Sequence, residues 1–148
     1  KRIQKTVKET GEWFIPHVVE PAFGIDRILW HVLDHAYDES EKSGEPYRML
    51  KLSSLVAPVE VVILPLFEKN GMDAIAAELH KQCCMIPNLV SMYDASGSIG
   101  KRYARADEIG VPLCITVDHQ SVEDNTVTMR TRDDGSQVRI PIDELPFL

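Results

Sequence analysis

Hydrophobic residues recur at helical spacing in three stretches of the chain, which span residues 25–36, 72–84 and 99–109. Residues three or four positions apart lie on the same side of a helix, so each stretch predicts an amphipathic helix. In the third stretch the apolar stripe consists of Ile99, Tyr103, Ala106 and Ile109. Gly110 follows it, where a chain that leaves a helix adopts a left-handed conformation, so we expect this helix to end there.

Strands are predicted between these helices. Residues 59–66 (VEVVILPL) form a nearly continuous apolar run, which is typical of a strand buried on both faces. Shorter runs at 88–93 and 112–117 predict two further strands. The order strand, helix, strand, helix, strand, with short connections, predicts an α/β fold with a parallel sheet and right-handed crossovers.

The end of the chain shows strict alternation instead. Residues 126–132 and 137–142 alternate on either side of the turn sequence DDGS, which predicts a β-hairpin. One face of this hairpin carries Val127, Met129, Val138 and Ile140. The other carries Arg130, Arg132 and Arg139, which are expected to face solvent or a partner.

The beginning of the chain is predicted to be part of something larger. Residues 12–20 read as a strand, the helix of residues 25–36 follows, and a polar stretch at 38–46 breaks the chain before the α/β pattern begins. One strand and one helix cannot bury enough surface to fold alone. The chain also starts without methionine, so we expect it to be a fragment.

Composition narrows the class of protein. The 148 residues are 44% hydrophobic and 26% charged, with a net charge of −7, which disfavours a protein that coats nucleic acid by bulk charge. A local basic patch remains compatible with that balance. No apolar run reaches the length of a membrane helix and no signal peptide is recognisable. The three cysteines, Cys83, Cys84 and Cys114, give no disulfide framework and are expected to be free thiols.

Candidate chemistry centres on residues 94–110 (DASGSIGKRYARADEIG), where a loop leaves a predicted strand and enters a helix. Ligands of parallel sheets bind at such loops, and the amides of a helix start favour anions. The stretch is not a nucleotide P-loop, because Ala95 replaces the first glycine and Arg102 replaces the hydroxyl residue. Lys101, Arg102 and Arg105 fall away from the apolar stripe. Two interpretations stay open: contacts to nucleic-acid phosphates, or a solvated basic face balanced by the acidic residues that follow.

A second candidate lies at 20–29 (EPAFGIDRIL), where Gly24 precedes a helix start that carries Arg27. An arginine in that position can reach a ligand phosphate with its planar fork of donors. His31 and His35 have the spacing of a zinc protease motif, but the sequence HVLDH lacks the glutamate of that motif. We therefore predict no metal site.

Together these segments resemble one family. The segment VVEPAFGIDRIL is similar to the third signature motif of class II aminoacyl-tRNA synthetases. The segments GSIGKRYARADEIGVPLCITV and VTMRTRDDGSQVRIPIDEL resemble the C-terminal anticodon-binding domain of eukaryotic and archaeal glycyl-tRNA synthetases. The resemblance implies a mixed, mostly parallel sheet flanked by helices, preceded by a strand and helix from an antiparallel catalytic domain. It places the end of the catalytic domain and a connector at residues 1–56 and the anticodon-binding domain at 57–148.

The resemblance also implies roles near the beginning of the chain. Arg27 matches the arginine that holds the ATP phosphates, and Gly24 lies beside it in the ATP site. Glu20 matches the glutamate that receives the ammonium group of glycine. The family's usual serine in the glycine pocket is replaced here by Ala22, which keeps the pocket small but removes a hydroxyl.

For the anticodon domain the resemblance favours RNA contact over a merely solvated surface. Lys101, Arg102 and Arg105 become candidates for contacts to the RNA backbone. Base edges in an unstacked loop would be read by Asp94, Ser96 and Ser98. Arg130 and Arg132 are a second group of tRNA-binding candidates, with a solvated hairpin face as the alternative.

The implied function is part of an ATP-dependent glycine–tRNA ligase that binds tRNA-Gly. ATP with Mg²⁺ and glycine would be bound by the full-length enzyme, a homodimer through its catalytic domain, whereas this chain alone is expected to bind neither and not to aminoacylate. The expected location is the cytoplasm, with the mitochondrion as a second option, and neither a membrane nor DNA is an expected partner. The alternative is a non-catalytic tRNA- or protein-binding module with the same fold. A third option is a small nucleotide-binding domain, which is disfavoured because the chain lacks a P-loop.

Overall fold

The structure is a computed structural model, and it describes residues 5–6, 11, 13–42 and 44–147. Its main body is a five-stranded sheet in the order β6-β5-β7-β8-β9. The strands are β5 (Val61–Pro65), β6 (Ser91–Tyr93), β7 (Leu113–Val117), β8 (Thr126–Thr131) and β9 (Gln137–Pro141). The pairs of β5 with β6 and with β7 are parallel, and those of β8 with β7 and with β9 are antiparallel. The predicted α/β class with a mixed sheet is confirmed.

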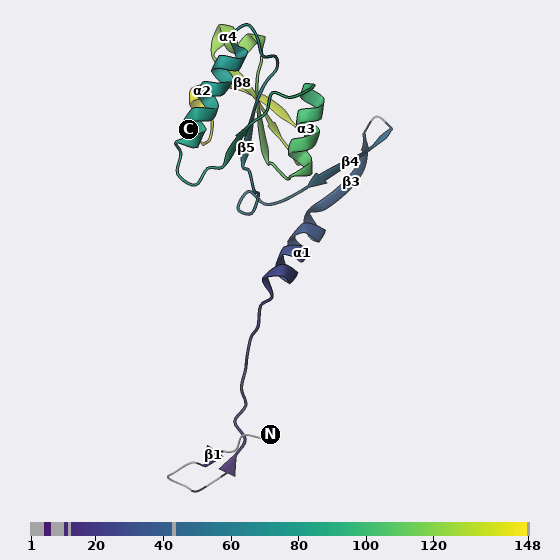
Figure 1. Cartoon of the computed structure of the whole chain (residues 1–148), viewed down its shortest axis with the longest axis vertical. Helices are drawn as coiled ribbons and strands as arrows, with labels where there is room; N and C mark the ends of the chain where they lie inside the picture. Colours follow the sequence, from purple (N-terminus) through teal and green to yellow (C-terminus); the bar gives the residue numbers. More distant parts are fainter. Residues whose placement is uncertain (1–4, 7–10, 12, 43, 148) are drawn as a thin grey trace.

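Helices cover both faces of this sheet (Figure 1). They are α2 (Met72–Cys84) and the short α4 (His119–Asp124) on one face, and α3 (Ile99–Glu108) on the other. Along β5 successive side chains point to opposite faces, so Val61 and Ile63 pack in the core under α2 while Val62 and Leu64 pack under α3. This is why β5 is buried along its whole length, as its unbroken apolar run predicted.

The predicted helices agree closely with the observed ones. The bounds of α2 coincide with the predicted 72–84, and Met72, Ala76, Leu79 and Cys83 of its apolar stripe are fully buried. Gly110 has the expected left-handed conformation after α3, with φ +82°. A Cβ at Gly110 would lie 2.8 Å from Leu52 Cδ1, so the glycine also lets the chain preceding the sheet pass close by.

The polar stretch at 38–46 is not a simple break, and that prediction was wrong. It lies within an antiparallel hairpin of β3 (Tyr37–Lys42) and β4 (Glu45–Leu50). An exposed ion pair joins the two strands, from Arg48 Nε to Glu39 Oε1 at 3.2 Å, and β4 packs against α3. The hairpin owes its place to pairing and to the contact with α3 rather than to an apolar pattern.

The predicted strand at 12–20 is also largely wrong. Only β2 (Trp13–Phe14) is a strand there, paired with β1 (Lys5–Thr6), and residues 15–24 belong to no helix or strand. Pro16 and Pro21 cannot donate backbone hydrogen bonds, and no described strand lies beside this segment. Glu12, the first residue of the prediction, lies outside the described residues.

Helix α1 (Ile25–Ala36) forms as predicted, but it lies away from the sheet (Figure 1). Apart from Ala36 its side chains are exposed or half-buried. The accessible surface of the chain is 10362 Å², whereas a compact protein of 16.7 kDa exposes about 7,600 Å². The excess is in keeping with an N-terminal segment whose apolar side chains have no core of their own.

No helix in the described part of the chain is long and apolar enough to span a membrane.

Candidate nucleic-acid interface

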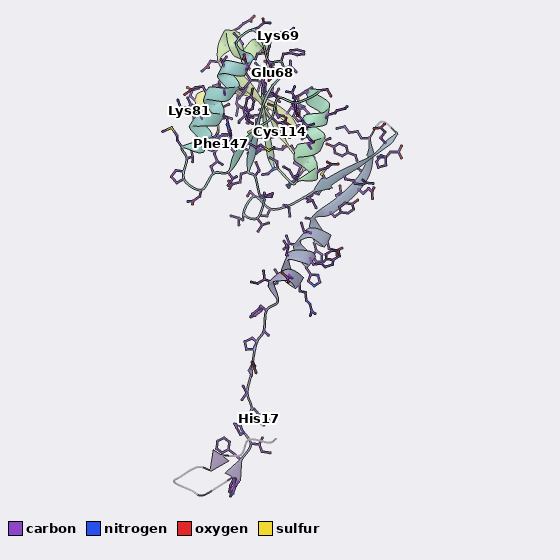
Figure 2. The ribbon with its side chains drawn as sticks, in the orientation of Figure 1. His17, Glu68, Lys69, Lys81, Cys114 and Phe147 are labelled. Carbon is purple, nitrogen blue, oxygen red and sulfur yellow. The ribbon has the colours of Figure 1, made fainter. Side chains whose placement is uncertain are left out.

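The candidate site lies at the edge of the sheet where the parallel strands end. The chain leaves β5 toward α2 on one face and leaves β6 toward α3 on the opposite face. Neighbouring strands whose connections diverge in this way leave a crevice between their loops, the usual place for a ligand in such sheets. Two loops border this crevice, residues 66–71 after β5 and residues 94–98 after β6. In Figure 2, Glu68 and Lys69 of the first loop lie at the end of the molecule far from α1.

A small polar cluster shapes the second loop. Asp94 Oδ1 accepts hydrogen bonds from the Ser96 amide and hydroxyl, both at 2.9 Å. Arg105 Nη2 donates to Asp94 Oδ2 at 2.6 Å, and to Ser96 O at 2.7 Å and Ser96 Oγ at 2.9 Å. Partial burial alone would raise the pKa of Asp94, but the Arg105 and Ser96 hydrogen bonds outweigh it, so its pKa lies below the ordinary value. The loop is therefore held in one shape, with the Arg105 guanidinium fixed at its rim.

Arg102 lies beneath this loop, and the expectation that it faces away from the core was wrong. Its side chain is buried, with 5% of its surface exposed. Nε and Nη2 donate to Gly97 O at 3.2 and 2.7 Å, and Nη1 donates to Pro65 O. Arg102 therefore joins the end of β5 to the 94–98 loop, across the crevice. Its position explains this, because it lies three residues after Ile99 and four before Ala106 and so shares their side of the helix.

Lys101 and Ser98 are exposed at the start of α3, beside that loop. Ser98 is the N-cap residue of α3, and its side chain makes no capping hydrogen bond. At the other end of the apolar stripe, Ile109 is 40% exposed rather than buried. Hydrogen bonds thus join Asp94, Ser96 and Arg105, and Ser98 and Lys101 lie beside them in the chain at the start of α3.

Arg130 is buried on the α3 side of the sheet and does not face solvent. Its Nη1 and Nη2 donate to the two carboxylate oxygens of Asp107 at 2.9 and 2.8 Å. The guanidinium lies 4.9 Å from the ring centroid of Tyr103, and the Tyr47 hydroxyl of β4 donates to the same carboxylate. The Asp107 hydrogen bonds hold the pKa of Arg130 above its usual value, while burial, followed by Asp107, raises the pKa of Tyr47. Asp107 therefore does not balance a basic face at the surface. It is buried and joins α3, β8 and the hairpin.

Arg132 has a comparable structural role. Only 4% of its surface is exposed. Nη1 donates to Gly110 O and Nη2 to Leu52 O, both at 2.8 Å, and Nε donates to Asp133 Oδ1 at 2.8 Å. These bonds tie the connector that precedes the sheet to the end of α3. Neither a solvated hairpin face nor an exposed RNA contact describes Arg130 and Arg132 in this structure.

Sequence reasoning missed an aromatic pair at the same edge of the sheet. The ring centroids of Phe67, after β5, and His119, after β7, lie 5.9 Å apart at 41°. Lys69 Nζ lies 5.2 Å from the Phe67 centroid. The available signal was position alone, because each aromatic residue comes within two residues of a strand's carboxyl end.

The second sequence candidate is not assembled into a pocket by this chain. Glu20, Ala22, Gly24 and Arg27 are all exposed, and Gly24 caps α1 with extended backbone. Within the described residues neither Glu20 nor Arg27 has a side-chain hydrogen bond or ion pair. These residues alone do not build a cavity for a nucleotide or for glycine, so their roles depend on other parts of a larger protein.

The histidine and cysteine side chains are candidates as metal ligands and as nucleophiles, because both residue types can serve in either role. Across residues 5–6, 11, 13–42 and 44–147, no group of at least three His, Cys, Asp or Glu side chains could hold a metal ion. The rings of His31 and His35 pack edge to face, with centroids 6.1 Å apart. All three cysteines are free, and burial raises the pKa of the Cys114 thiol to about 12. Cys114 is therefore a core side chain rather than a nucleophile.

Comparison with known proteins gives close relatives. A glycine–tRNA ligase of Archaeoglobus fulgidus is 49% identical over 90% of this chain, and one of Methanocaldococcus jannaschii is 50% identical over 98% of it. The chain spans only 23% and 24% of the lengths of these relatives. It is thus similar to about a quarter of each ligase.

Solved structures and a protein family give the same picture. Prolyl-tRNA synthetase of Cryptosporidium parvum, solved with L-proline and AMP, matches with a TM-score of 0.58 at 27% identity, covering 65% of this chain and 21% of that one. The RNA binding domain of threonyl-tRNA synthetase from the same organism shares the fold, with a TM-score of 0.56 at 20% identity over 64% of this chain and 23% of that one. The family described as "Anticodon binding domain" matches residues 60–147, which include the whole five-stranded sheet and its helices. The chain therefore belongs to the anticodon binding domain family.

Proposed function

We propose that this chain is part of a glycine–tRNA ligase and that its α/β region binds the anticodon stem-loop of tRNA-Gly. The observation that carries the proposal is the alignment of 98% of the chain with a glycine–tRNA ligase at 50% identity. The geometry supports it, because the exposed polar cluster lies at the edge of the sheet where such folds bind ligands.

The proposed contact surface has two kinds of side chain. Lys101 and Arg105 are exposed cations on α3 that suit phosphate oxygens, which position an RNA without reading its sequence. Asp94, Ser96 and Ser98 offer the donors and acceptors that read base edges in an unpaired loop. The net charge of −7 makes this local placement more important than the overall charge.

Arg105 is preorganised for this task. Its hydrogen bonds to Asp94 and Ser96 use Nε and Nη2, and none of them uses Nη1. A side chain that is already fixed loses less conformational entropy when a phosphate binds. Asp94 in turn keeps one carboxylate oxygen engaged with Ser96, so the cluster responds to RNA as a unit.

Arg102, Arg130 and Arg132 have supporting roles in this proposal. Each guanidinium is already engaged with carbonyl or carboxylate groups of the chain, so a direct phosphate contact would break buried hydrogen bonds. Arg102 positions the loop that carries the polar cluster. Arg130 and Arg132 fix the hairpin and the connector against α3 and β8.

The N-terminal segment belongs to the proposed catalytic part, with the boundary near residue 56. In the full-length ligase Arg27, with Gly24 beside it, would bind the ATP phosphates, and Glu20 would bind the ammonium group of glycine in a pocket bordered by Ala22. The exposure of all four residues supports a site that other segments complete. We therefore propose that ATP with Mg²⁺ and glycine bind only to the full-length enzyme, a homodimer through its catalytic domain, located in the cytoplasm.

The test is a titration of the 148-residue chain with tRNA-Gly and with the same tRNA carrying a swapped anticodon, each at two salt concentrations. The proposal expects tighter binding of the cognate tRNA by about tenfold or more, which corresponds to about 1.4 kcal/mol. It also expects affinity to fall as salt rises, because phosphate contacts release counterions. Equal affinity for both tRNAs would refute anticodon recognition.

An aminoacylation assay separates the proposal from its alternative, a non-catalytic tRNA- or protein-binding module. The chain alone is expected to charge no tRNA, whereas Arg27→Ala in the full-length enzyme should slow adenylate formation and leave tRNA affinity intact. A measurable charging rate from the chain alone contradicts the fragment proposal. A module would bind tRNA or a protein without any Arg27-dependent adenylate formation in the full-length protein.

A further inference from the structure

Phe67 stands out at the carboxyl edge of the sheet because it is large, apolar and exposed. The fraction of its surface that is exposed is 47%, although it comes two residues after the fully buried strand β5. The neighbouring Leu66 is still bonded to the sheet, because its amide donates to Val117 O at 2.7 Å. The backbone beside Phe67 is thus fixed to β7, which holds the aromatic ring at this edge.

Two further side chains border the ring. His119, at the start of α4, has its ring centroid 5.9 Å away at 41°, and Lys69 Nζ lies 5.2 Å from the Phe67 centroid. An aromatic neighbour restricts the orientation of the ring, and the ammonium group is attracted to its electron-rich face. The arrangement is an ordered, exposed aromatic ring with a cation over it.

The position of this face relative to the polar cluster is set by strand order. β6, β5 and β7 are neighbours in the sheet and parallel, so Asp94, Phe67 and His119 follow one another along its carboxyl edge. The aromatic ring and the Asp94 loop therefore follow adjacent strands at the same edge of the sheet.

We propose that Phe67, backed by His119, is a stacking platform for one unpaired base of the bound RNA loop. The inference rests on the proposed function, because it assumes that RNA binds at this edge. The base would lie on the exposed ring of Phe67, and Lys69 would leave the ring for the phosphate of the same nucleotide. Every base offers a π-face, so the platform contributes affinity and does not read base identity.

This division of labour makes the inference separable from the proposed function. Loss of stacking lowers affinity for any loop that places a base on the ring, whether or not the anticodon is cognate. The ratio of affinities for cognate and swapped anticodons is then retained, because the polar cluster still reads the base edges. Phe67→Ala should weaken binding of both RNAs by the same factor, between about fivefold and 150-fold.

The experiment uses the full 148-residue chain and tRNA-Gly stem-loops with 2-aminopurine at each loop position in turn. In the wild type the fluorescence of one position should be quenched on binding, and Phe67→Ala should abolish that quenching. Phe67→Trp should retain it because the aromatic face remains, and Phe67→Leu should lose it although apolar bulk remains. The matched control is Met85→Ala, which removes a 78% exposed apolar side chain at the opposite end of α2.

The outcomes distinguish the two proposals. The absence of binding refutes the proposed function and the platform with it, whereas equal affinity of the wild type for cognate and swapped stem-loops refutes anticodon recognition alone. Discrimination by the wild type, with Phe67→Ala unchanged in affinity and in quenching, refutes the platform alone. A Phe67→Leu variant that binds like the wild type also overturns the inference, because apolar contact would then suffice without stacking.

Discussion

The region from residue 59 to 147 and the region from residue 13 to 36 contain the same kinds of apolar side chain, but the second buries only Ala36. Val61, Ile63 and Leu64 have no exposed surface, whereas Val19 is 91% exposed and Phe23 81%. A groove of about 580 Å³ between α1, the connector and the end of α3 is lined mainly by aliphatic side chains. The contrast shows that helical spacing predicts a helix but does not identify the surface that covers it.

The two regions also differ in how they use charge. In the sheet region Arg102, Arg130 and Arg132 are buried and complete the packing, while near α1 Arg27 is exposed. A buried guanidinium needs partners for its donors, and here carbonyl and carboxylate oxygens supply them. These three arginines, which the sequence suggested as RNA contacts because of their charge, are internal supports of the fold. The predictions below test this difference, beginning with the largest effect.

Arg130→Ala should have the largest effect, because it leaves the fully buried Asp107 carboxylate without its bidentate partner. Breaking one side of a buried pair costs about 3–5 kcal/mol of unfolding free energy. Urea denaturation followed by circular dichroism measures it. Arg130→Met combined with Asp107→Leu removes both charges and should recover much of the loss. A cost for Arg130→Ala below about 0.5 kcal/mol, typical of surface positions, would show that this arginine is not part of the core.

Arg102→Ala should lower the unfolding free energy by about 1–3 kcal/mol, since the carbonyls of Pro65 and Gly97 lose a buried donor. The salt dependence of the proposed RNA binding should be unchanged, because the Arg102 side chain is buried. Lys101→Ala is the matched control, with the opposite pattern: little change in stability and a salt slope shallower by about 0.7. If Arg102→Ala reduces the salt slope and Lys101→Ala does not, Arg102 contacts phosphate and Lys101 does not, which contradicts this prediction.

Asp118→Asn tests a half-exposed pair in the sheet region. Arg139 Nη1 and Nη2 donate to the Asp118 carboxylate at 2.7 and 2.9 Å, and these bonds lower the pKa of Asp118. A depressed pKa gives stability that is present above the unfolded value, near 3.9, and is lost as the pH falls through the lower folded value. The variant should lose about 0.5–1 kcal/mol at pH 7.

The same variant should also show a shallower loss of stability between pH 5 and pH 2 than the wild type. Asparagine still caps α4, so the comparison isolates the charge. Thermal unfolding across that pH range provides the measurement, and identical pH profiles for the two proteins would contradict the role of the pair.

Trp30→Ala should have the smallest effect in this chain, within about 0.5 kcal/mol, because the side chain is 69% exposed. In the proposed full-length ligase the same change should cost about 3–5 kcal/mol if a further domain covers α1. Urea unfolding of both proteins gives the comparison. Equal small effects in the two would mean that this face of α1 stays exposed in the larger protein.

Much of the fold could be predicted from the sequence, because local patterns decided it. The unbroken run of β5 and the stripe of α2 each specify one element and its buried side, and the alternation of β8 and β9 specifies the hairpin, although β8 also buries Arg130 on the face that was expected to be exposed. The hairpin of β3 and β4 escaped prediction because its side chains are mostly polar and its place depends on Tyr47 reaching Asp107. The strand expected at 12–20 failed because strands need neighbours, and this segment has few among the described residues.

The candidate site was partly predictable for the same reason. Ligands bind at the loops that follow parallel strands, so the sequence was enough to place Asp94, Ser96 and Lys101 near such a loop. The burial of Arg102 could have been suspected from its spacing to Ile99, but the burial of Arg130 and Arg132 could not. Their partners lie 23 and 80 residues away in the chain, at Asp107 and Leu52, and no local pattern records such pairs.

The attachment of the hairpin to α3 has a consequence for the order in which the protein folds. Tyr47 is joined to Asp107 across 60 residues, and Leu52 to Arg132 across 80. On the ribosome the hairpin emerges long before either partner has been synthesised, and closing such long loops is slow. We expect the hairpin to dock last, as a late event on a finished sheet. A Tyr47→Phe variant should then unfold faster without refolding more slowly, with a φ-value near zero.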